Sequence, residues 1–384
     1  MKRLNRITPL NHRSPVPLHV QLRERLRTVL EFFEEGEKFY SEQEIARHFN
    51  LSRGTVRRAL ADLTYEGLLE RKSGKGTFVK KGIEGEDGEK GKNLTVGIFL
   101  PNVKSDFLRE MVEKISQACQ DMGCSTKLYF THSGTRVSQA CEQLDESPKR
   151  EGIILMGGPV DIAKELALSL DERGYKIVFV DTVIEELPYD YVATDNVQGA
   201  MMVVKYLADL GHRRIGILIN EPFNHPSVIK RLEGYQRAVR LLGLDMDEKL
   251  ICNCHTRDWE NTAEAAYNNI SKLLSLSHPP TAIFVISDGG ALGIYKALKE
   301  RRINIPEDIS IVGFDDDQFS RFMDPPLTTV AQPKEEIARK AVSILISRMK
   351  GIEKDKPQRV LLPPQLVIRE SSMPPHTDKN DDEK

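Results

Sequence analysis

The ten residues 51–60, LSRGTVRRAL, combine three arginines with two small hydroxyl residues in a segment that otherwise favours a helix. Arginine donates hydrogen bonds from a planar fork, and serine and threonine add short polar groups, a combination that suits phosphate oxygens. The whole chain has a formal net charge of −2, yet residues 1–81 hold 17 Lys and Arg against 10 Asp and Glu. The remaining residues hold 38 against 47, so a basic segment precedes an acidic one and is expected to meet a polyanion.

A second group of chemically useful residues follows apolar strands. Asp181 ends the run KIVFVD, Asp288 follows TAIFVI, and Asp315 follows ISIVGF. Ligands of parallel α/β sheets bind at the carboxyl ends of the strands, so these carboxylates are expected at the mouth of a cleft. There they could accept hydrogen bonds from the hydroxyl groups of a polar ligand. An aspartate in this place can also cap the next helix, and for Asp288 both interpretations stand.

The elements that position the arginines are three helices and a hairpin. The segment LHVQLRERLRTVLEFF has one apolar face, and Ser41 with Glu44 predicts a capping box at the start of SEQEIARHF. Ser52 is expected to cap the next helix, with Val56 and Leu60 pointing inward. The segment GLLERKSGKGTFVKK then predicts two strands joined by a glycine-rich turn.

A helix, a short turn and a second helix place the start of the second helix in the major groove of DNA. Arg53 has the reach for a bidentate contact with guanine, whereas Ser52, Thr55 and Arg57 suit phosphate oxygens. The hairpin tip SGKG has no bulky side chain and carries Lys75, so its backbone could approach a groove closely. The alternatives are a solvated basic face for the helix and a plain tight turn for the tip.

Residues 82–93, GIEGEDGEKGKN, have no large apolar side chain and are predicted to be a flexible linker. After it, apolar strands alternate with amphipathic helices at 107–122, 196–210 and 291–301, which predicts doubly wound parallel sheets covered on both faces. The expected domains are a head at 15–81, the linker at 82–93, a body at 94–372 and a disordered tail at 373–384.

Several classes of protein and site are disfavoured by composition. No apolar run is long enough for a signal peptide or a membrane span, so we expect a cytoplasmic protein with no membrane partner. Five scattered cysteines suit free thiols better than zinc ligands, and the run Asp315–Asp317 lacks the spacing of a calcium loop. We therefore expect no metal and no cofactor.

The head resembles the winged-helix DNA-binding domain of the GntR family over roughly 17–80. SEQEIARHFNLSRGTVRRALADLTYEGLLERKSGKGTFV carries the likeness, although Phe39-Tyr40 stands where the family usually has Leu-Pro. The resemblance implies that Glu42 and Arg53 lie near bases and that Thr55 and Arg57 bind phosphate. The expected DNA-contacting residues also include Ser52 and the wing tip, which consists of Ser73, Gly74, Lys75 and Gly76.

The body resembles the LacI/GalR family, whose core is similar to periplasmic sugar-binding proteins. The segment ISDGGALGIYKALKERRINIPEDISIVGFDDDQFSRFMDPPLTTVAQP carries most of the likeness. A GntR-like head on such a body is the arrangement of arabinose repressors of the AraR type. The resemblance implies that Arg231 binds the ligand, that Trp259 stacks on it and that Phe107 closes the cleft. Ser287 stands where the family often has Asn, beside Asp288.

Together these features predict a multidomain protein: a small α+β winged helix-turn-helix head and an α/β periplasmic-binding-protein-like body of two doubly wound subdomains. The expected function is that of a transcriptional repressor, not an enzyme, whose affinity for operator DNA is controlled by a small sugar or related polar ligand. We expect a homodimer, whose two-fold arrangement would place two heads on a palindromic operator. The rivals are a sugar-modifying enzyme on the same fold and a sugar receptor without regulation; no nucleophile elbow or phosphate loop supports the former.

Overall fold

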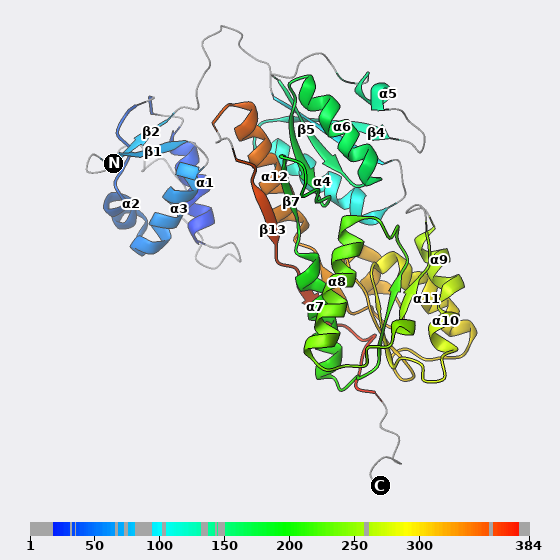
Figure 1. The fold of residues 1–384 in the computed structure, drawn as a ribbon. Coiled ribbons are helices and arrows are strands. Elements are labelled where there is room, and N and C mark those ends of the chain that lie inside the picture. Colours follow the sequence, from blue (N-terminus) through cyan, green and yellow to red (C-terminus); the bar gives the residue numbers. More distant parts are fainter. Residues whose placement is uncertain are drawn as a thin grey trace. The chain divides into compact units, whose positions relative to one another are not determined.

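The computed structural model describes residues 18–375, apart from gaps at 31–32, 35, 66–67, 73–75, 81–93, 102–104, 132–136, 143, 145–149, 257–260 and 353–355. The chain divides into two compact units, Met1–Gly91 and Lys92–Lys384 (Figure 1). The first unit contains the head and the second contains the body. The predicted linker at 82–93 lies outside the described residues.

The head has three helices followed by a two-stranded antiparallel hairpin, as its sequence predicts. Their bounds are α1 Leu18–Leu30, α2 Glu42–Phe49, α3 Arg53–Tyr65, β1 Leu69–Lys72 and β2 Gly76–Val79. The predicted capping box is present. The Ser41 side chain accepts a hydrogen bond from the Glu44 backbone N–H, and the Glu44 carboxylate accepts one from the Ser41 backbone N–H. Asn50 takes a left-handed conformation (φ 52°) that ends α2 and turns the chain into α3.

Aromatic packing fixes the entry into α2. Phe39 and Tyr40, which replace the usual Leu-Pro, pack with Phe33 at ring-centroid distances of 5.1 and 5.5 Å. Phe39 also donates its backbone N–H to the carbonyl of Thr77 in the hairpin. Ring packing and this hydrogen bond therefore constrain the segment in which the family usually has a proline.

The amino-terminal subdomain of the body is built on a six-stranded sheet of order β13-β7-β6-β5-β3-β4, in which all neighbours are parallel. Its strands are β3 Thr95–Pro101, β4 Ser125–Thr131, β5 Glu151–Met156, β6 Lys176–Val180, β7 Asp190–Thr194 and β13 Arg359–Leu362. Helices α4 Asp106–Asp121 and α12 Lys334–Met349 pack on one face, and α5 Val137–Cys141 and α6 Val160–Glu172 pack on the other. Figure 1 shows these helices flanking the sheet.

The carboxyl-terminal subdomain is built on a four-stranded parallel sheet of order β11-β10-β8-β9. Its elements are α7 Asn196–Asp209, β8 Ile215–Ile219, α8 Pro226–Leu241, η2 Glu248–Leu250, β9 Ile251–Asn253, α9 Thr262–Asn269, α10 Ser271–Leu274, β10 Ala282–Val285, α11 Asp288–Glu300, β11 Ser310–Val312 and η3 Gln318–Phe322. Strands β12 Thr329–Ala331 and β14 Gln365–Val367 pair antiparallel. A Cβ at Gly293 would overlap the Ala263 carbonyl oxygen, so glycine lets α11 and α9 cross closely.

Two expectations need correction. Helix α11 begins at Asp288 rather than Ala291, because Ser287 takes an extended conformation and two glycines continue the helix. The body also extends past Ser372: Met373 accepts from His212 (2.9 Å) and donates to Ser310 (3.1 Å), so a tail that begins at 373 begins too early. No helix in the described part of the chain is long and apolar enough to cross a bilayer.

Candidate nucleic-acid interface and ligand cavity

The exposed face of α3 carries the predicted arginines. Arg53, Arg57 and Arg58 are exposed, while Val56 and Leu60 on the opposite face are fully buried. The Ser52 hydroxyl accepts from the Thr55 backbone N–H (3.2 Å). The apolar anchor therefore presents the arginines to solvent at the start of a capped helix, where backbone N–H groups also favour anions.

Glu42 connects the two elements expected to meet DNA. Its carboxylate accepts from Arg57 at 3.4 Å and from Arg71 at 2.8 Å. The sequence interpretation missed Arg71 on β1. It could have been found as a basic residue at a solvent-facing position of the predicted hairpin. Glu42 is thus an ion-pair partner of two cations as well as a candidate base-proximal residue.

The wing tip is described only at its end. Gly76 has φ 115°, a left-handed value that favours glycine, and it pairs with Lys72 in the hairpin. Ser73, Gly74 and Lys75 lie outside the described residues.

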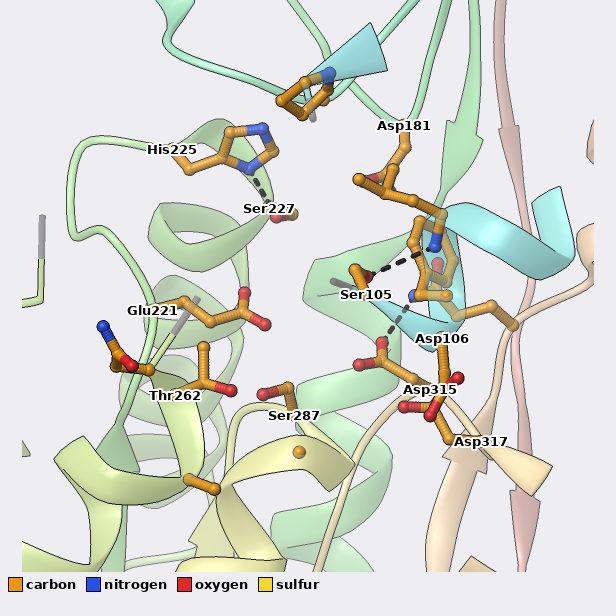
Figure 2. Close-up of a pocket in the computed structure, with 18 of the residues that line it drawn as sticks. Ser105, Asp106, Asp181, Glu221, His225, Ser227, Thr262, Ser287, Asp315 and Asp317 are labelled. Atoms are coloured by element: carbon orange, nitrogen blue, oxygen red, sulfur yellow. Dashed lines mark hydrogen bonds between the residues drawn. The ribbon is translucent and has the colours of Figure 1, made fainter. Parts of the chain in front are cut away.

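A cavity of about 380 Å³ lies between the two subdomains of the body. Both sheets direct the carboxyl ends of their strands toward it, as predicted for doubly wound sheets. Its lining includes Phe107, Asp181, Arg231, Ser287 and Asp315. The Glu221 carboxylate faces Ser105 and Asp315 across the space, and the Ser287 oxygen points toward the side of Glu221 (Figure 2).

Arg231 on α8 is buried with a relative exposure of 3%. Its guanidinium donates to Asn196 (2.8 Å), to the carbonyl of Ile286 and to Asp315 (3.2 Å). The group also lies 3.8 Å from the ring centroid of Phe314. The resemblance implies that this fork binds a ligand. Part of the fork already binds the protein, and one N–H on each terminal nitrogen stays available.

Asp181 is held in an unusual backbone conformation at the cavity wall. Its φ is 62°, its relative exposure is 8%, and its Oδ1 has no hydrogen-bond partner within the described structure. Burial raises the pKa of this carboxyl to about 6, although the nearby Arg231 acts in the opposite direction. A left-handed backbone conformation and an unpaired buried oxygen both occur more often at functional sites.

Glu221 and Asn220 were missed by the sequence interpretation. They follow β8 in the same way that Asp181 follows β6, so the signal was present in RIGILI-NE. Asn220 donates to the Ser287 hydroxyl (2.8 Å), and burial raises the pKa of Glu221, which lines the cavity, to about 7. The family often has an asparagine at position 287. In this chain the side-chain amide that donates here comes from Asn220, and the Ser287 hydroxyl accepts its hydrogen bond.

Asp288 does not reach the cavity, so its prediction as a ligand-binding residue is corrected. It is fully buried, and its carboxylate accepts from Asp317 N–H (3.0 Å), Ser320 (2.6 Å) and Thr329 (2.6 Å). Its backbone N–H donates to Phe314 (2.8 Å). Asp288 instead fixes the loop that carries Asp315 and Asp317.

Asp317 lines the cavity and is buried, and its Oδ1 has no hydrogen-bond partner among the described residues. The nearest cation is Lys334, whose amine lies 3.7 Å away and donates to Glu110 at 2.7 Å. Burial, reinforced by Asp315 and Asp288, raises the pKa of Asp317 to about 8. The sequence interpretation counted Asp317 only in a disfavoured calcium loop.

Phe107 is buried at the start of α4 in the cavity wall, and its role in closing the cleft stays a prediction. Trp259 lies outside the described residues, so its stacking role stays a prediction. His225 also lines the cavity, and its Nδ1 lies 2.7 Å from the Ser227 hydroxyl. No cluster of His, Cys, Asp and Glu suited to a metal ion occurs in the portion of the chain that the structure describes.

Comparisons with known proteins agree with this architecture. Residues 19–79 match the family model of bacterial regulatory proteins of the gntR family, and residues 204–372 match a periplasmic binding protein-like domain. The chain is 31% identical to the HTH-type transcriptional repressor CytR of Escherichia coli K12, over 75% of this chain and 82% of that one. It is 27% identical to the arabinose metabolism transcriptional repressor of Geobacillus stearothermophilus, over 93% and 98%.

Solved structures give the same result. A LacI transcriptional regulator from a Rhodococcus species matches with a TM-score of 0.63 and 26% identity, over 73% of this chain and 98% of that one. A LacI family regulator from Enterococcus faecium with bound ribose matches with a TM-score of 0.60 and 25% identity, over 73% and 99%. The fold and the two domain types define a DNA-binding transcriptional regulator. The chain belongs to the LacI family of transcriptional repressors, and its head is of the gntR type. The predicted fold class and both resemblances are confirmed.

Proposed function

We propose that this repressor responds to a small sugar or related polyhydroxylated ligand bound in the cavity between its subdomains. The observation that carries the proposal is the unpaired, buried Asp181 oxygen in the wall of a 380 Å³ cavity. Hydroxyl groups of a sugar would supply the missing donors, and the apolar ring of Phe107 suits the less polar face of a sugar. A ribose-bound relative and arabinose metabolism repressors among the relatives support this ligand class.

The proposed DNA contacts are Arg53 to base edges and Ser52, Thr55 and Arg57 to phosphates, with Glu42 and the wing tip beside them. The proposed ligand contacts are Phe107, Asp181, Arg231, Ser287 and Asp315, with Trp259 stacking and Glu221 added from the structure. Asp288 supports the loop.

The protein is proposed to act as a homodimer on a palindromic operator, because two-fold repressors place two heads on related half-sites. Strand β4 is at the edge of its sheet and exposes Leu128 and Phe130 at 45% and 40%. An apolar edge strand of this kind suits contact with a second copy.

Catalysis is not part of the proposal. Among the described cavity residues, Ser227 and His225 pair a hydroxyl group with an imidazole that could act as a base. Burial and the nearby Arg231 lower the pKa of His225 to about 4, so its imidazole is a weak base at neutral pH. The pair is better suited to positioning a ligand hydroxyl.

The proposal is tested with purified full-length chain. Its operator is first selected from a random duplex library, and anisotropy titrations then measure operator affinity with and without sugars that raise the melting temperature. We expect at least a tenfold change in affinity with one such sugar. A sugar that binds the body without changing operator affinity would support a receptor instead of a regulator.

A further inference from the structure

The cavity is rich in acidic side chains. Among the described residues, six carboxylates line it: Asp106, Asp181, Glu221, Glu264, Asp315 and Asp317. The basic residues in the described lining are Arg231 and His225. The balance of ionisable groups is therefore acidic, although burial keeps some of these carboxyls protonated near neutral pH.

The positive charge of Arg231 is already engaged by the protein. Asp315 lies 3.2 Å from its guanidinium, and Asn196 and the Ile286 carbonyl accept from two further nitrogens. His225 is buried beside Arg231, which disfavours the charged imidazolium. An incoming anion would find no uncompensated cation among the described groups that line this space.

Hydrogen-bond acceptors in the wall lack donors. Asp181 Oδ1 and Asp317 Oδ1 are buried without a hydrogen-bond partner in the described structure, and the Lys334 amine lies 3.7 Å from the Asp317 oxygen. Asp181 and Asp317 both line the cavity, and their relative exposures are 8% and 5%. A buried acceptor without a donor is costly, so the occupant is expected to bring O–H or N–H groups to these oxygens.

We propose that the cavity selects a compact ligand that carries several O–H or N–H donors and no anionic group, and that it rejects phosphorylated or carboxylated forms of the same skeleton. This inference rests on the proposed function, since it specifies the ligand class of the same cavity. A phosphate would lie among carboxylates in a poorly solvated space, where like charges repel strongly. We expect a discrimination of about 100-fold or more.

The test is isothermal titration of the full-length chain at pH 7.5 with matched pairs. The pairs are D-ribose and ribose 5-phosphate, L-arabinose and arabinose 5-phosphate, D-glucose and glucose 6-phosphate, and cellobiose and cellobionate. At least one neutral member should bind about 100-fold more tightly than its anionic partner. An anionic member that binds as tightly as its parent overturns the charge selection and leaves the sugar-responsive function standing. Failure of every member to bind overturns both.

Variants separate charge from shape. Glu221→Gln removes one carboxylate at nearly constant volume and should lower the ratio of neutral-member to anionic-member affinity about tenfold, whatever its effect on the affinity of the neutral member alone. Glu165→Gln, on the exposed surface of α6, should change neither affinity. If Glu221→Gln does not fold, Asp181→Asn serves for the same comparison. An unchanged ratio between the two members in a folded variant contradicts the proposal.

Discussion

The Lys334 amine and the Asp317 carboxyl group form a buried contact that joins the two subdomains. The Lys334 amine at the start of α12 lies 3.7 Å from a carboxylate oxygen of Asp317, which belongs to the loop after β11. Both side chains are less than 10% exposed. The same amine donates to Glu110 on α4 and lies 5.6 Å from the ring centroid of Phe107. A cavity residue is thus connected to the helices of the opposite subdomain.

Replacing Lys334 by Met should destabilise the body by about 2–4 kcal/mol, because it removes the buried amine that contacts Asp317 and the partly buried Glu110. Ligand affinity should also fall, since Asp317 loses the charge that orders it. Calorimetric unfolding of the full-length chain measures the first effect. Lys205→Met, which breaks the exposed Lys205–Asp209 pair, is the matched control and should change stability by less than about 1 kcal/mol. Equal effects of the two substitutions would contradict the bridging role.

Asp181→Asn should change how stability depends on pH. A folded-state pKa raised to about 6 means that the native state binds this proton more tightly than the unfolded chain. The stability that the protonated Asp181 carboxyl contributes to the folded state is therefore present below about pH 4 and is lost as pH rises through about 6. Asparagine does not titrate and tolerates the left-handed φ. The free energy of unfolding of the variant, relative to that of the wild type, should therefore rise by about 2–3 kcal/mol between pH 4 and pH 7. Parallel pH profiles of the two melting temperatures would show that Asp181 titrates normally.

Glu42→Gln should strengthen binding to DNA of any sequence. The substitution removes the negative charge that holds Arg57 and Arg71, so both become available to phosphates. We expect a two- to tenfold higher affinity for a scrambled duplex. The slope of log affinity against log salt concentration should also steepen by the amount that about one additional phosphate contact produces. Anisotropy titrations at several salt concentrations measure both. Weaker binding would mean that Glu42 orients the arginines productively.

Arg53→Ala should remove operator preference with little effect on ligand binding. A bidentate arginine contact with guanine contributes about 1–3 kcal/mol of discrimination, so the ratio of operator to scrambled affinity should fall by about 5- to 150-fold. Arg25→Ala on the exposed side of α1 is the control and should preserve the ratio. An operator preference that survives in Arg53→Ala would move the base contact to another residue.

The sequence predicted the head and the sheet architecture because both depend on local patterns. The capping box needs only Ser41 and Glu44, and apolar strands that alternate with helices require a covered parallel sheet. The patterns also placed Asp181 and Asp315 at the cavity, because parallel strand ends meet at one edge.

The same sequence patterns do not predict how side chains are oriented. Asp288 follows a strand just as Asp181 does, yet Ser320 and Thr329 satisfy its carboxylate, and these partners lie 32 and 41 residues away in sequence. The lining role of Asp317 and its contact with Lys334 likewise depend on tertiary packing. Only the folded chain distinguishes a satisfied carboxylate from an unpaired one.

The central claim is that a ligand in the cavity controls operator binding by the head. It is tested most directly by operator titrations of the wild type and of Glu221→Ala, each with and without the neutral sugar that binds most tightly. The account predicts equal operator affinity of the two proteins without sugar, and at least a tenfold change on adding sugar in the wild type alone. A wild type whose operator affinity is the same at saturating sugar would contradict it.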